Sequence, residues 1–132
     1  MTGKFTFSNE VRRDGVPWGS LSWLSTPTMT EAKALVAVEV TFDPRGGHSF
    51  HKHPNQEELI YVLEGEIEQW VDRESRVLGP GDSAFICADV VHASFNLGEG
   101  SARILAILGP SVGEEGYELV DVSGEEPWAS LR

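Results

Sequence analysis

Two histidines near the middle of the chain have the type and spacing of metal ligands. His51 and His53 are two residues apart, and because side chains alternate faces along a strand, both imidazoles should point the same way. Two imidazoles on one face can bind a transition metal together. Lys52 lies between them in the sequence and should point away, where its charge does not oppose a bound cation.

A carboxylate and a third imidazole could complete the site from other strands. Glu58 shares a strand face with Ile60 and Val62, and an unpaired carboxylate is costly to bury on an apolar face unless a cation neutralises it. His92 begins another β-prone run, and a closed barrel brings inward-facing side chains of distant strands together. We therefore predict one divalent metal ion with four ligands: His51, His53, Glu58 and His92.

Other readings of these residues remain open at this point. A lone His-x-His pair can also be two surface histidines on an exposed strand. Glu57 is the rival carboxylate, because a bulge at the preceding turn would exchange its face with that of Glu58. His48 differs in parity from His51, so we expect it to point outward or lie in a loop, with a supporting role near the metal less favoured.

The elements that would position these ligands are short β-prone runs separated by Gly, Pro, Asn and Asp. Regular spacing of this kind indicates an all-β sandwich or barrel. Helix is expected only as a short stretch at Thr30–Lys33. The predicted strands are Ala34–Phe42, Ser49–His53, Leu59–Leu63, Glu66–Val71, Ser83–Cys87, His92–Asn96 and Ala102–Leu108.

The chain divides into three parts around one predicted domain. Residues 1–33 should form N-terminal outer strands, and the run Trp18–Leu24 is expected as an outer strand that could pair with a second subunit. Residues 34–110 should form the barrel core with the metal site, and residues 111–132 should form a tail that packs on the barrel. A length of 132 residues suits a single domain.

Composition excludes several classes of function. The formal net charge is −11, and such a surface repels phosphate backbones, which argues against nucleic-acid binding. The single cysteine, Cys87, excludes an internal disulfide and a cysteine-based zinc cluster, and we expect it to be a small buried apolar group. No apolar run is long enough to span a membrane and no secretory signal is seen, so we expect a cytoplasmic protein.

The segment from about residue 34 to residue 108 resembles the two signature motifs of the cupin superfamily. The first motif matches at His51-Lys52-His53, Glu58 and Gly65, although its opening glycine, Gly46, is one residue out of register. The second motif matches at Gly81, His92 and Asn96, with Cys87 and Asp89 in place of its Pro and Gly. The resemblance implies a cupin jelly-roll barrel, also called a double-stranded β-helix, that coordinates iron, manganese, nickel, zinc, cobalt or copper. Asn96 is expected to be structural.

Three functions are compatible with this ligand set. The resemblance favours a dioxygenase-type enzyme that acts on a small oxygenated molecule such as an enediol, a β-diketone or a flavonol-like phenol, with Glu58 as a possible general base. The first alternative is a non-oxidative isomerase, lyase or cyclase that uses the metal as a Lewis acid. The second alternative is a binding module without turnover. We also expect a homodimer, built by strand pairing and by face packing of the doubly apolar strand Leu59–Leu63.

Overall fold

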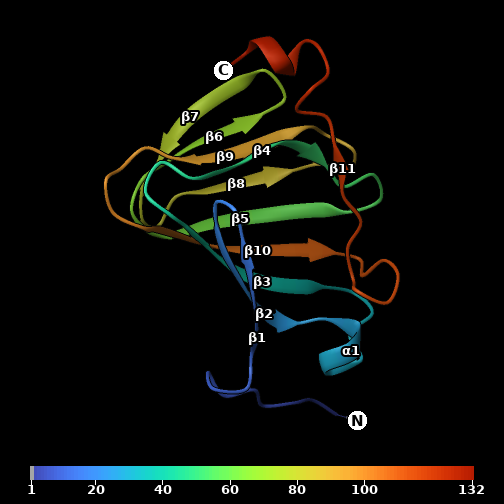
Figure 1. The fold of residues 1–132 in the computed structure, drawn as a ribbon. Helices are drawn as coiled ribbons and strands as arrows, with labels where there is room; N and C mark the ends of the chain where they lie inside the picture. The colour runs from blue at the N-terminus through green and yellow to red at the C-terminus, as the bar shows by residue number, and fades with distance from the viewer. Residues whose placement is uncertain (1) are drawn as a thin grey trace.

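Two antiparallel β-sheets face each other in the computed structural model of the protein, which describes residues 2–132 (Figure 1). The six-stranded sheet has the order β1-β2-β3-β10-β5-β8, and the five-stranded sheet has the order β11-β4-β9-β6-β7. The strands are β1 (Arg12–Val16), β2 (Gly19–Ser25), β3 (Val36–Phe42), β4 (Gly47–Lys52), β5 (Glu57–Glu64), β6 (Ile67–Val71), β7 (Glu74–Leu78), β8 (Ser83–Ile86), β9 (His92–Asn96), β10 (Ala102–Gly109) and β11 (Val120–Asp121). This arrangement confirms the predicted all-β jelly-roll fold in a single domain.

Helical structure in the described residues, 2–132, is confined to two single turns. The first, α1 (Pro27–Thr30), starts where Thr26 accepts a hydrogen bond from the Met29 amide and where proline suits the first helical position. This turn shares only Thr30 with the predicted helical stretch at Thr30–Lys33, so that prediction was wrong for the three residues that follow. The second is the 3₁₀ turn η1 (Trp128–Ser130). No helix within residues 2–132 has the length and apolar character needed to cross a membrane.

The main core lies between the two sheets and follows from strict alternation. In β3 every second residue, from Val36 to Phe42, is buried, and β10 alternates in the same way. Since side chains of a strand alternate between its faces, this pattern places one apolar face of the six-stranded sheet against the barrel interior. The interior therefore has an apolar wall opposite the strands that carry the histidines.

A second apolar cluster covers the outer face of the five-stranded sheet. Phe50 is buried there with Val91 and Val122, and Phe95 packs against the same cluster. Trp128 and Leu131 of the C-terminal tail also pack there. Phe50 and His51 thus point to opposite faces of β4, as alternation predicts.

Two further expectations about local structure were wrong, and strand β7 was missed. Cys87, which follows β8, is exposed rather than buried, because the chain leaves the sheet at this point. Strand β7 was not predicted, since most of its side chains are exposed and its pairing with β6 leaves no clear apolar alternation. The run Trp18–Leu24 is not an outer strand, because the overlapping strand β2 pairs with β1 on one edge and with β3 on the other.

A bulge in β4 changes the direction of one histidine. His48 pairs with Ser94 of β9 and His51 pairs with His92, so a step of three residues in β4 opposes a step of two in β9. The extra residue turns His48 to the same side of the sheet as His51. Gly47 lies beside this bulge, where a side-chain carbon would collide with the ring of Phe95.

Candidate metal centre

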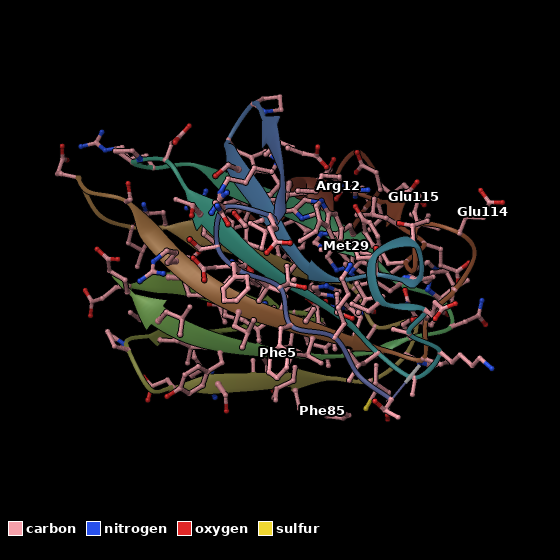
Figure 2. All side chains as sticks on the ribbon, turned by 90° about the horizontal axis from the view of Figure 1, so that it is seen from below. Phe5, Arg12, Met29, Phe85, Glu114 and Glu115 are labelled. Carbon is pink, nitrogen blue, oxygen red and sulfur yellow. The ribbon has the colours of Figure 1, made fainter. Side chains whose placement is uncertain are left out.

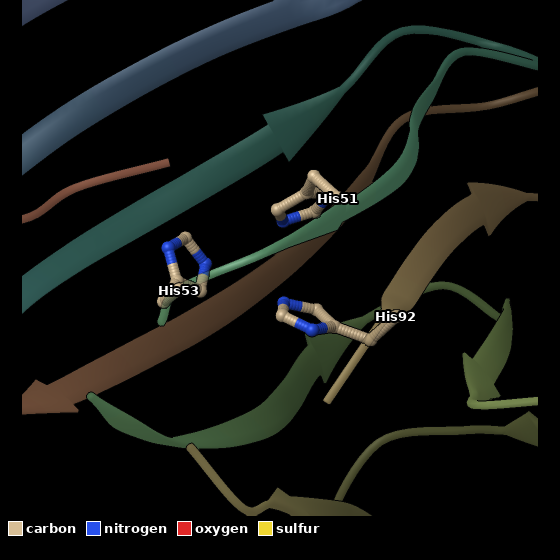
Figure 3. A group of neighbouring side chains, drawn as sticks. All are labelled: His51, His53 and His92. Atoms are coloured by element: carbon tan, nitrogen blue, oxygen red, sulfur yellow. The ribbon is translucent and has the colours of Figure 1, made fainter. Parts of the chain in front are cut away.

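The predicted ligands are brought together inside the barrel from three strands. β4 and the residue after its end supply His51 and His53, β5 supplies Glu58, and β9 supplies His92. All four side chains are between 1% and 6% exposed. One ring nitrogen from each of the three histidines lies within 4.8 Å of the others, and Figure 3 shows the three rings gathered around a shared space.

Backbone carbonyls set the same tautomer in all three rings. Each Nδ1–H donates to a main-chain oxygen, which leaves Nε2 of the neutral ring with a free lone pair. The three acceptors are the carbonyl oxygens of Ser49 for His51 at 2.7 Å, Glu118 for His53 at 2.7 Å and Val90 for His92 at 2.9 Å. Metal-binding imidazoles are oriented by hydrogen bonds of this kind to the opposite nitrogen.

The carboxylate of Glu58 faces two of these lone pairs. Its Oε1 lies 2.8 Å from Nε2 of His92 and 3.2 Å from Nε2 of His53. Within residues 2–132, Oε1 of Glu58 and Nε2 of His92 are buried atoms without a hydrogen bond of good geometry. Buried polar atoms are rarely left in this state, and a cation between them would satisfy both. The donor set therefore fits a divalent transition metal, and Glu57, which is exposed, does not take part.

Burial and charge keep most of the site in the protonation state that a metal requires. Burial lowers the pKa of His51 well below its ordinary value, and the neighbouring imidazoles lower it further. Burial alone would raise the pKa of Glu58, but His53 and His92 outweigh it and hold this pKa well below the usual range. Burial would likewise lower the pKa of His53, but the Glu58 carboxylate outweighs it and raises this pKa.

His48 faces the site. The expectation that it points outward or lies in a loop, which came from its odd spacing to His51 along the strand, was wrong. Its ring stacks on His51 with centroids 3.6 Å apart and planes at 11°. On its other side it stacks on Trp18, at 4.9 Å and 20°. Burial lowers the pKa of His48 to about 4, so the ring is neutral at pH 7. The bulge in β4 is the physical reason for this orientation.

A cavity of about 230 Å³ opens beside the histidines and reaches Glu58. Its wall is formed mainly by β2, β3, β4, β10 and the segment before β11. The lining residues are Val16, Pro17, Trp18, Leu21, Trp23, Val38, Val40, His48, His51, His53, Glu58, Ala106, Leu108, Tyr117 and Leu119. A small molecule in this space would contact the candidate ligands directly.

The sequence analysis missed the residues that bring the C-terminal segment to the site. The amide of Gln56, 2% exposed, donates to the carbonyl oxygens of Pro110 at 2.7 Å and Gly116 at 2.9 Å, and accepts from the Glu118 amide at 3.2 Å. This anchoring places Tyr117 beside His53, with ring centroids 5.8 Å apart. A single glutamine in a polar turn carries no sequence signal for such a role.

Asn96 has the structural role expected of it. Its side-chain amide donates to the carbonyl oxygens of Asp43 at 3.0 Å and Gly100 at 2.8 Å. Its side-chain oxygen accepts from the Gly98 amide at 2.9 Å. These bonds hold the turn after β9, which keeps this strand and His92 in register with β4.

A barrel of two antiparallel sheets that gathers three imidazoles and a carboxylate in its interior is a jelly-roll protein with a candidate metal centre. The chain belongs to the cupin family, since the family model described as "Cupin domain" matches residues 38–108.

Named relatives and a solved structure are similar to this chain. The polyketide synthase CurC of Streptomyces cyaneus is 33% identical over 92 residues, which are 70% of this chain and 60% of that protein. Quercetin 2,3-dioxygenase of Bacillus subtilis (strain 168) is 33% identical over 64 residues, which are 48% of this chain and 19% of that protein. The structure of KdgF from Halomonas sp. superposes with a TM-score of 0.73 at 25% identity, over 83% of this chain and 94% of that one. The match thus spans less than two thirds of CurC.

Proposed function

We propose that this protein is a metal-dependent enzyme, with one divalent transition metal held by His51, His53, Glu58 and His92. The observation that carries the proposal is a pair of buried atoms, Oε1 of Glu58 and Nε2 of His92, which form no hydrogen bond of good geometry within residues 2–132. They lie in a site whose three imidazoles share one tautomer. Three neutral imidazoles, one carboxylate and a divalent ion carry a net charge near +1. A bound iron, manganese, nickel or zinc ion would polarise a substrate oxygen or, if redox-active, bring O₂ to an electron-rich substrate.

The side chains of the protein position the substrate and exclude water. The cavity beside the site is lined mostly by apolar residues, which strengthen polar interactions at the ligands by removing water. Glu58 belongs to the cavity wall, but its lowered pKa keeps it ionised and makes it a weak base. This favours a role for Glu58 as a ligand over a role as the general base.

A dioxygenase reaction on a small oxygenated molecule is the first candidate. The similarity to quercetin 2,3-dioxygenase supports it, and so does the apolar cavity wall, which suits an uncharged electron-rich substrate. A non-oxidative reaction with the metal as Lewis acid is the second candidate. It is favoured by the longer match to CurC, whose name describes a polyketide synthase.

Metal content and oxygen uptake test the proposal. We expect about one transition metal ion per chain by mass spectrometry of the purified protein. His51→Ala and His92→Ala should each lose the metal and lower the melting temperature, since a metal that binds only the folded state stabilises it by mass action. His48→Ala is the matched control and should keep the metal. Unchanged metal stoichiometry in both ligand variants would overturn the assignment.

The reaction class is decided by substrate panels. The iron-loaded protein should consume O₂ with at least one compound in a panel of β-diketones, catechols and flavonols. If no compound supports oxygen uptake, the dioxygenase candidate is wrong. Isomerisation or cyclisation of the same compounds by the zinc-loaded protein, followed by NMR, would then support the Lewis-acid candidate.

A further inference from the structure

The wall of the cavity beside the metal centre is chemically uniform. Beyond the candidate ligands, its side chains are aliphatic or aromatic except for His48 and Tyr117. The cavity lining described in residues 2–132 includes no Lys, Arg, Asn, Gln, Ser or Thr. A polyhydroxylated molecule buried there would leave most of its hydroxyl groups without hydrogen-bond partners, which is costly.

Flat rings flank both of the imidazoles that reach the cavity. On one side, the ring of His51 stacks on His48, which stacks on Trp18. Trp18 in turn stacks on Phe42, with ring centroids 5.4 Å apart. On the other side, His53 lies beside Tyr117. The rings of Tyr117 and Trp23 have centroids 5.4 Å apart. Two aromatic walls next to the ligands suit a planar guest, because ring faces pack most closely on other flat rings.

The indole of Trp23 contributes its ring rather than its polar group. Its Nε1–H donates to Asp14 at 2.9 Å and is therefore already used. Within the described part of the chain, no hydrogen bond is formed by the His48 ring or by the Tyr117 hydroxyl. A small molecule in the cavity could therefore form polar contacts with His48 and Tyr117 at the sides and with the metal at the end.

The charge of the wall and the size of the cavity limit the class of ligand further. Among the described residues no cationic side chain lines the cavity, so only the metal would balance an anionic oxygen. The metal with its four ligands has a net charge near +1, which balances a single negative charge. The volume of about 230 Å³ is smaller than the roughly 300–1,000 Å³ of sites for drug-sized ligands. One or two fused rings with oxygen substituents match this space and charge, whereas a sugar acid is disfavoured because its hydroxyl groups would lack hydrogen-bond partners on the apolar wall.

We infer that the site takes a flat, conjugated molecule of one or two rings with neighbouring oxygen substituents, stacked along Trp18 and Trp23 with its oxygens toward the histidines. His48 and Tyr117 act as specificity residues that contact its remaining polar groups. The orientation of the ligand's oxygens toward the histidines rests on the proposed function, because a bound metal would attract them. Stacking of the ligand's ring on the aromatic wall does not require a metal.

Calorimetric titration with two probes tests the inference. We expect 2,3-dihydroxynaphthalene to bind both the metal-free and the zinc-loaded protein, more tightly with zinc, and D-galacturonate to bind neither. Trp18→Ala should weaken 2,3-dihydroxynaphthalene at least about tenfold in both forms. Tyr117→Phe keeps the ring and is the safer variant for folding. It should lower the affinity for 2,3-dihydroxynaphthalene about threefold. Trp70→Phe, a tryptophan outside the cavity, is the matched control and should bind like the wild type.

The outcomes separate this inference from the proposed function. If zinc binds with unit stoichiometry but 2,3-dihydroxynaphthalene does not bind, or binds more weakly than D-galacturonate, the ligand class is wrong and the metal site stands. If zinc does not bind but 2,3-dihydroxynaphthalene binds in a Trp18-dependent way, the metal proposal is wrong and the ligand class stands. Wild-type affinity in both Trp18→Ala and Tyr117→Phe would overturn the placement of the ring.

Discussion

Two imidazoles of the candidate centre, His51 and His53, differ in how they hold protons, although they share a tautomer. His51 packs against His48 and is kept neutral by burial, which lowers its pKa. His53 faces the Glu58 carboxylate, which raises its pKa in spite of burial. A proton that competes with a metal ion is therefore taken up at His53 before it is taken up at His51.

Metal affinity should consequently depend on pH through His53. Below the raised pKa of His53 the ring carries a proton on Nε2 that a metal must displace, so affinity should fall as the pH falls from 8 to 6, by up to about tenfold per unit. Titration of the metal-free protein with Zn²⁺, in buffers of different ionisation enthalpy, measures both the affinity and the proton released. Constant affinity over this range, with no proton release, would contradict the prediction.

At the scale of the elements, the segment between β10 and β11 closes the site. It carries Tyr117 into the cavity wall, and its Glu118 carbonyl orients His53. Gln56, in the turn before β5, holds this segment by three hydrogen bonds. The position of His53 therefore depends on an element that is distant from it in the sequence.

Gln56→Leu should weaken both folding and metal binding. The substitution leaves the Pro110 carbonyl and the Glu118 amide without their partner, whereas the Gly116 carbonyl keeps its hydrogen bond from the Val112 amide. Each unsatisfied group costs about 1–3 kcal/mol, so we expect about 2–4 kcal/mol less stability in urea unfolding. Zinc affinity should fall about tenfold or more, since partners that orient metal-binding imidazoles typically have effects of this size.

Asn55→Ala is the matched control for this prediction. Asn55 lies in the same turn and hydrogen-bonds the exposed side chain of Glu118, so its loss should cost less than about 1 kcal/mol. If both variants unfold at the same urea concentration, Gln56 does not anchor the segment.

At the scale of the whole molecule, the outer face of the six-stranded sheet has an apolar area that residues 2–132 do not cover. Leu59 and Tyr61 of β5 are 40% and 41% exposed, and Phe85 of β8, which pairs with Leu59, is 56% exposed. Figure 2 labels the side chain of Phe85. Strand β8 lies at the end of this sheet and pairs only with β5 among the described strands, so its other edge is free. An apolar face that continues to a free strand edge suits pairing with a second copy through one two-fold axis.

We therefore expect a homodimer that buries this face. Light scattering at micromolar concentration should give twice the mass of the chain, and Phe85→Asp should shift the protein to a monomer, since it places a charge in the apolar contact. Val77→Asp is the matched control, because Val77 is 57% exposed on β7 of the other sheet and should leave the mass unchanged. A monomeric wild-type protein would refute the prediction.

The sequence by itself determined the fold class and the four residues of the candidate centre. Alternation along β3, β5 and β10 and the turn residues between strands are local features, and local features define strands and their faces. The same alternation indicated Glu58 rather than Glu57, because a strand that begins at the turn can bury only one of two successive side chains.

Only the tertiary structure decided what surrounds those ligands. His48 turns inward because pairing with β9 introduces a bulge in β4, and a bulge depends on the partner strand rather than on the local sequence. Gln56, Tyr117 and Trp23 reach the site through long-range contacts that leave no periodic pattern in the chain. Ligands on a regular strand can thus be read from spacing, whereas the cavity that selects a substrate depends on how separate elements pack.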